Sequence, residues 1–82
     1  MRILRVDATL ERTGDTRSPH YDKVAKGLFT KSIKIGERAA GWPEHEVDAL
    51  IAARIRGDSA DQIKKLVAKL HEARRATQPV FA

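Results

Sequence analysis

The sequence predicts a mainly helical fold with one small β-hairpin, and three observations lead to this prediction. Two stretches after Pro43 repeat their apolar residues at intervals of three and four, as a helix with one buried face requires. Over residues 32–36 the apolar period shortens to two and ends at a glycine, as in a tight hairpin. The stretch 18–27 begins with Ser-Pro and ends with glycine, which is the pattern of a short helix.

The composition describes one small globular domain. The chain has 82 residues, of which 41% are apolar, enough for a small core and too many for a disordered chain. It has no cysteine, which excludes disulfides and cysteine nucleophiles and suits a reducing cytoplasm. The opening segment is too short and too charged for a signal peptide, and no apolar run approaches a membrane span. We therefore expect a cytoplasmic protein without a membrane partner.

Two short elements come before the basic part of the chain. Apolar side chains between arginines over residues 1–6 indicate a short strand. Asp7 is expected to cap a helix over 8–13 that Gly14 ends. This helix has fewer than two turns, so it must depend on tertiary packing.

The next helix has clear ends. Ser18 is expected to be its N-cap, and Pro19 suits the first helical position, where a missing N–H costs nothing. Tyr21 and Val24 recur at helical spacing, and Gly27 ends the helix in the left-handed region. Two short helices around a glycine turn are typical of a helix-turn-helix, although any small α/β domain with two adjacent short helices gives the same pattern.

The hairpin that follows is basic. Ile33 and Ile35 point to one face, Lys34 points to the other, and Gly36 opens the turn. Residues 17–38 contain six Lys or Arg and two acids, so this segment carries a net charge of +4 out of the chain's +5. A helix that can enter a groove beside a charged hairpin is the outline of a winged helix-turn-helix DNA-binding domain.

Two longer helices complete the predicted fold. Pro43 is expected at the first position of a helix that Gly57 ends. Its stripe consists of Val47, Leu50, Ile51 and Ile55, with Arg54 at the edge. The core is expected to include Leu10, Val24, Phe29 and Trp42. The chain then divides into a winged helix-turn-helix domain over 1–57, an amphipathic helix over 58–78 and a tail over 79–82.

The final helix begins with a capping box of Ser59 and Gln62. Its apolar stripe consists of Ile63, Leu66, Val67, Leu70 and Ala73. The stripe packs on the preceding helix of the same protomer, forms the seam of a dimer, or does both with one broad face. Its regular 3-4 spacing and the basic residues after it favour the dimer slightly.

No constellation of catalytic or metal-binding residues is present in the sequence. The three histidines lie far apart and lack the spacing of metal ligands. Ser18 and His20 do not face each other on a helix, so they do not begin a catalytic triad. The stretch 36–41 lacks the glycine spacing and the Lys-Ser/Thr pair of a phosphate-binding loop. We expect no enzyme activity, no metal and no cofactor.

A series of short motifs resembles the AlpA family, small regulators carried by prophages and related mobile elements. The matching residues are Arg12-Thr13-Gly14, Arg17-Ser18, Tyr21, Gly27-Leu28-Phe29, Lys34-Ile35-Gly36, Arg38-Ala39, Gly41-Trp42 and Glu46-Val47. They follow in order between Arg2 and Arg54. The resemblance implies a MerR-like, excisionase-like winged-helix fold that binds DNA in a bacterial host, near the nucleoid. It also implies a role as a transcriptional regulator of integrase and excision genes, or as an excisionase with a phage integrase as partner.

The resemblance places functional residues and also marks departures. Arg17, Ser18 and Tyr21 match the start of the family's recognition helix, and its wing is matched by Lys31, Lys34 and Arg38. Asp15, His20 and Lys23 stand where the family usually has apolar residues, and Asp22 stands where a basic residue is usual. These departures predict a different DNA preference rather than a different fold.

The predicted function is sequence-specific binding of double-stranded DNA by a homodimer or a cooperative multimer. The candidate DNA contacts are Arg17, Ser18, His20, Tyr21, Lys23, Lys26, Lys31, Lys34 and Arg38. Tyr21, Lys23 and Lys26 are equally well explained as structural or surface residues. The alternative is a small phage-encoded adaptor or inhibitor that docks on a host protein through the 63–73 stripe.

Overall fold

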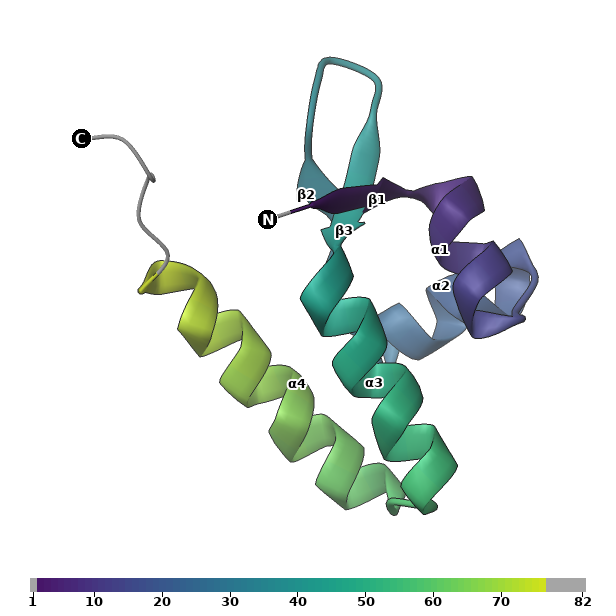
Figure 1. The fold of residues 1–82 in the computed structure, drawn as a ribbon, viewed down its shortest axis with the longest axis vertical. Helices are drawn as coiled ribbons and strands as arrows, with labels where there is room; N and C mark the ends of the chain where they lie inside the picture. The colour runs from purple at the N-terminus through teal and green to yellow at the C-terminus, as the bar shows by residue number, and fades with distance from the viewer. Residues whose placement is uncertain (1, 77–82) are drawn as a thin grey trace.

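The computed structural model describes residues 2–76 and shows four helices with a three-stranded antiparallel sheet (Figure 1). The elements in chain order are β1 (Ile3–Arg5), α1 (Val6–Thr13), α2 (Arg17–Ala25), β2 (Ile33–Lys34), β3 (Ala40–Pro43), α3 (Glu44–Arg56) and α4 (Ala60–Arg75). This architecture confirms the predicted fold class. The proposed end of the last helix at Gln78 and the tail over 79–82 lie outside the described residues. Within the described part, no helix is long and apolar enough to cross a membrane.

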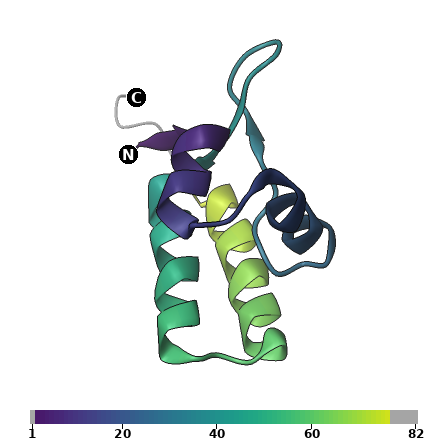
Figure 2. The ribbon, with the colours of Figure 1, turned by 90° about the vertical axis from the view of Figure 1, so that its right-hand side faces the viewer.

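The sheet joins the N-terminus to the hairpin in the order β1-β3-β2. Leu4 lies opposite Trp42, and Ile33 lies opposite Gly41. We call β2, the 35–39 loop and β3 the wing; it projects beyond the rest of the molecule (Figure 2). Gly41 is required where β3 pairs with β1, because a Cβ there would lie 2.6 Å from the carbonyl oxygen of Leu4.

The structure shifts three predicted helix starts by one or two residues, the first two toward the N-terminus and the third toward the C-terminus. Helix α1 begins at Val6, so Asp7 lies in its first turn and Arg5 is its N-cap. Helix α2 begins at Arg17 after Thr16, so Ser18 is not its cap. Pro43 precedes α3 because the backbone there is still in β3, opposite Ile3.

Two other predicted helix boundaries are confirmed. Gly27 has φ +76°, and the next amide, from Leu28, donates to the carbonyl of Lys23. Ser59 and Gln62 form the predicted capping box, with both reciprocal hydrogen bonds present.

The core forms around Trp42, which is fully buried and donates through its indole N–H to the carbonyl of Thr30 at 2.7 Å. The other buried apolar residues are Leu4, Phe29, Val47, Leu50, Ala53 and Val67. Val24 packs against this cluster from α2, whereas Leu10 is only half-buried. The prediction that Ile55 belongs to the buried stripe is wrong, because its side chain is 81% exposed.

Helix α4 packs inside the protomer. Val67 is part of the core cluster, and Ile63, Leu66 and Leu70 pack against it, while Ala73 is exposed. Val67 is thus buried within the chain and three more of the five stripe residues are partly buried there, whereas a dimer seam on the same stripe stays a prediction. The same packing partly covers the surface on which the alternative, a protein-binding adaptor, depends.

Candidate nucleic-acid interface

The exposed surface of α2 and the wing carries most of the predicted DNA contacts. Arg17, Ser18, Tyr21 and Lys26 are exposed on or just after α2, and Lys34 and Arg38 are exposed on the wing. Arg17 and Arg38 line the same hollow of 270 Å3 between the start of α2 and the wing. The structure therefore brings the helix and the wing together as one basic surface.

Lys31 lies apart from this surface. It precedes β2, and its carbonyl accepts a hydrogen bond from Arg74 at 2.7 Å near the end of α4. Its backbone N–H donates to Nε2 of His71 at 3.0 Å. Lys31 has an exposed side chain but belongs to the junction with α4 rather than to the wing.

The cations of α2 already have carboxylate partners. Arg17 pairs with Asp7 at 2.9 Å, and Lys26 pairs with Asp22 at 2.9 Å, one helical turn apart. All four side chains are more than half exposed, so these ion pairs contribute little stability and are easily exchanged. The pairing with Lys26 accounts for Asp22 on a surface where an acid would otherwise repel DNA.

His20 is not a DNA contact, because its side chain is fully buried. The ring lies edge-on to Trp42 and Phe29, with centroid separations of 4.6 and 4.8 Å. Within the described chain neither ring nitrogen has a hydrogen-bond partner. Burial lowers the pKa of His20, and the nearby Asp15 carboxylate opposes this effect. The ring is thus an uncharged packing group, in the position where an apolar anchor was expected.

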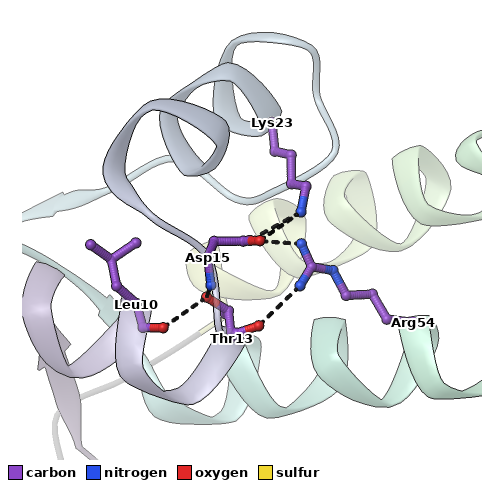
Figure 3. A network of polar contacts seen from close by, with 5 residues as sticks. All are labelled: Leu10, Thr13, Asp15, Lys23 and Arg54. Carbon is purple, nitrogen blue, oxygen red and sulfur yellow. Dashed lines mark hydrogen bonds and ion pairs between the residues drawn. The ribbon is translucent and has the colours of Figure 1, made fainter.

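Lys23 is also used inside the domain. Its ammonium contacts both carboxylate oxygens of Asp15, at 3.2 and 3.0 Å, and the side chain is 31% exposed (Figure 3). Arg54 of α3 donates to the same carboxylate at 2.7 Å and to the carbonyl of Thr13 at 3.3 Å. The network connects the turn between α1 and α2 to α3, and it gives Lys23 a structural role, one of the two roles that the sequence left open.

The two departures at Asp15 and Lys23 therefore compensate for each other. Each places a charge where an apolar residue was expected, and the two charges form an ion pair with Arg54 as a second cation. The signal in the sequence was that the two unexpected charges, at Asp15 and Lys23, have opposite signs. Arg54, at the edge of an apolar stripe, was the second part of that signal.

A family model described as "Prophage CP4-57 regulatory protein (AlpA)" matches residues 2–55. The chain belongs to this family. The matched residues extend from β1 almost to the end of α3, so they include the helix-turn-helix, the wing and Arg54.

Two relatives of this AlpA-family chain come from a phage and a bacterium. "Uncharacterized protein ORF88" of Enterobacteria phage P4 is 36% identical over 56 residues, 68% of this chain and 64% of that protein. "DNA-binding transcriptional activator AlpA" of Escherichia coli K12 is 33% identical over 64 residues, 66% of this chain and 86% of that protein.

A third match is to a much longer protein. "Aerobic cobaltochelatase subunit CobN" of Sinorhizobium sp. is 39% identical over 77 residues, 94% of this chain but 6% of that subunit. The chain thus spans 64% and 6% of the first two curated relatives. No solved structure matches the chain.

Helix α4 lies beyond the residues that the AlpA model matches, yet a buried ion pair connects it to the domain. Glu46 is fully buried, and Arg74 binds it bidentately at 2.6 and 2.7 Å. In the sequence, Glu46 stands out only as part of the Glu46-Val47 motif that matches the AlpA family. Its partner lies 28 residues away on another helix, so no local pattern indicated the pair.

Proposed function

We propose that this AlpA-family protein is a sequence-specific, double-stranded DNA-binding regulator of a prophage or related mobile element. Helix α2 enters the major groove, and the wing contacts the adjoining backbone. The observation that carries the proposal is the placement of Arg17, at the start of α2, and Arg38, on the wing, around one hollow. The Escherichia coli relative is described as a DNA-binding transcriptional activator, which supports the proposed DNA binding.

The exposed residues divide into two roles. Arg17, Ser18 and Tyr21 lie at the start of α2, where a recognition helix reaches base edges. Lys34 and Arg38 on the wing, with Lys26 at the end of α2, contact phosphates and position the domain. His20 and Lys23 have internal roles and are left out of this surface.

The domain acts in more than one copy on its target. A single module of this size reads few base pairs, so regulatory specificity needs paired or repeated sites. Because α4 packs within the protomer, the copies meet through DNA-dependent contacts rather than through a preformed α4 seam. Control of integrase and excision genes, or an excisionase role beside a phage integrase, are the specific functions that this arrangement serves.

Selection of duplexes from a random library tests the proposal. We expect enrichment of a defined sequence, and binding of it that weakens steeply with salt. Arg17→Ala should lose about 1–3 kcal/mol on the selected site and less on random duplex. Arg56→Ala is the matched control, since Arg56 also forms an exposed 2.9 Å ion pair, with Asp58, at the far end of α3 (Figure 1). Failure to enrich any sequence, with no salt-dependent binding of duplex, contradicts the proposed function.

A further inference from the structure

The hollow between α2 and the wing has an unusual set of charges. It is lined by Arg5 at the end of β1, Asp7 in α1, Arg17 in α2 and Arg38 in the wing, with Val6, Ala39 and Ala40 between them. Three guanidinium groups and one carboxylate give the lining a formal net charge of +2. Arg5 was not among the residues that the sequence indicated as DNA contacts.

The three arginines differ in their partners. Arg17 is held by Asp7, at 2.9 Å between Nη2 and Oδ1. Arg5 and Arg38 form no ion pair with any residue in the 2–76 range. The hollow thus has two uncommitted cations and a third whose partner is an exposed carboxylate on the same rim.

We infer that this hollow binds one backbone phosphate of duplex DNA through Arg5 and Arg38, and that Asp7 on its rim holds Arg17 until the bound DNA replaces the carboxylate as the partner of Arg17. The inference rests on the proposed function, and it adds Arg5 as a contact and Asp7 as a competitor. Guanidinium groups present paired N–H donors that fit phosphate oxygens. The hollow opens between α2, which is proposed to enter the major groove, and the wing, which is proposed to contact the DNA backbone. A phosphate of the bound strand passes between these two elements.

Asp7 makes this contact conditional. Its side chain is 88% exposed and that of Arg17 is 62% exposed, so water and salt screen their attraction and exchange is inexpensive. The carboxylate of Asp7 nevertheless repels an approaching phosphate. This repulsion matters most for DNA that makes no further contacts with α2. Asp7 thereby lowers binding to random DNA.

Binding curves at about 50 and 200 mM salt test the site, since each phosphate contact contributes about 0.9 to the slope of log affinity against log salt. Arg5→Gln should lower this slope by about 0.9, so its affinity deficit should shrink about 3.5-fold between the two salts. The matched control Arg56→Gln should leave the slope unchanged, because Arg56 lies at the other end of α3. Circular dichroism checks that each variant is folded; if Arg5→Gln is not, Arg38→Gln provides the same test.

The role of Asp7 needs a second pair of variants. Asp7→Asn should raise affinity for random duplex, and this gain should be smaller in an Arg17→Gln background. Wild-type slopes in both Arg5→Gln and Arg38→Gln overturn the inference while leaving the proposed function intact. Tight binding of inorganic phosphate alone, lost in Arg5→Gln, also overturns it, because the hollow would then be a site for a small free anion. Absence of any duplex binding by the wild type contradicts the proposed function instead.

Discussion

His20 shows how a polar residue is used as a packing group at the scale of a single side chain. It fills the space beside Trp42 and Phe29, with both ring nitrogens lacking partners in the described chain. A buried polar group without hydrogen bonds costs stability, and burial also disfavours the imidazolium. The stability of the domain should therefore depend on pH through this residue.

We expect unfolding to become easier as the pH falls below about 6.5, the ordinary pKa of histidine. The folded-state pKa of His20 is lowered, so the unfolded chain takes up its proton first, and stability is lost until the folded pKa is reached. His20→Leu should reduce this slope and raise the unfolding free energy at neutral pH by roughly 1–3 kcal/mol. Part of the slope should remain, because burial lowers the pKa of His71 as well.

Urea denaturation between pH 5 and 8 measures this dependence. His45→Gln is the control, since His45 is exposed and lies outside the core. A slope that is the same in the wild type and in His20→Leu would show that His20 does not titrate on unfolding.

The charges of Asp15 and Lys23 should be energetically coupled. Asp15→Leu leaves Lys23 and Arg54 without their shared carboxylate, so it should be clearly destabilising. Adding Lys23→Leu should recover part of the loss, because an apolar residue then faces an apolar residue. A double-mutant cycle measured by urea denaturation should give a coupling of about 0.5–3 kcal/mol. Strict additivity of the two single variants would contradict this pairing.

Elements in this fold are positioned by a few contacts between segments distant in sequence. The first strand pairs with β3 beside Gly41, where only a hydrogen fits against the backbone of Leu4. Arg12 connects α1 to α3 through Glu44 at 2.7 Å and Asp48 at 3.2 Å. Arg74 connects the end of α4 to Glu46 near the start of α3.

Gly41→Ala should separate β1 from β3. Its Cβ would lie 2.6 Å from the carbonyl oxygen of Leu4 and 2.8 Å from Cγ2 of Ile3, so the backbone must move. We expect a loss of about 2 kcal/mol or more in unfolding free energy. Gly36→Ala is the matched control, because its nearest neighbour, Cβ of Ala39, is 3.8 Å away, an ordinary contact. Equal thermal midpoints for the two variants would contradict the close approach of the β1 backbone to Gly41.

Arg74→Gln should release the end of α4. It leaves the carboxylate of Glu46 buried without its cation, at a cost of about 3–5 kcal/mol. Adding Glu46→Gln should recover much of this loss, because the buried charge is then removed as well. Arg75→Gln, one residue further on an exposed face, is the control and should have little effect. Thermal denaturation followed by circular dichroism compares the four proteins.

The molecule as a whole is a compact domain in which α4 completes the core. Val67 enters the core cluster, and Leu66 and Leu70 pack against it. The proposed DNA-binding elements lie away from the α3–α4 connection: the wing is at the opposite end of the molecule, and α2 lies about midway along it (Figure 1).

The double variant Leu66→Ala, Leu70→Ala distinguishes a core helix from a dimer seam. Truncating a buried leucine costs about 2–5 kcal/mol, and a domain of this kind has about 5–15 kcal/mol in total. We expect loss of cooperative unfolding in circular dichroism, and a wild-type protein that sediments as a monomer in the absence of DNA. A folded variant that sediments as a monomer, compared with a dimeric wild type, would show that the stripe joins two copies.

The sequence by itself determined the order of the elements, the hairpin, several helix ends and the basic segment. These depend on residues close in the chain: Gly27 ends a helix through its own backbone, and Ser59 caps one through Gln62. Only the tertiary structure decided that His20 is buried, that Lys23 pairs with Asp15 and that the buried Glu46 pairs with Arg74. It also decided that α4 packs against the core of its own protomer. Burial and charge pairing depend on which segments, distant in sequence, pack against each other. Local sequence patterns carry no information about these distant partners.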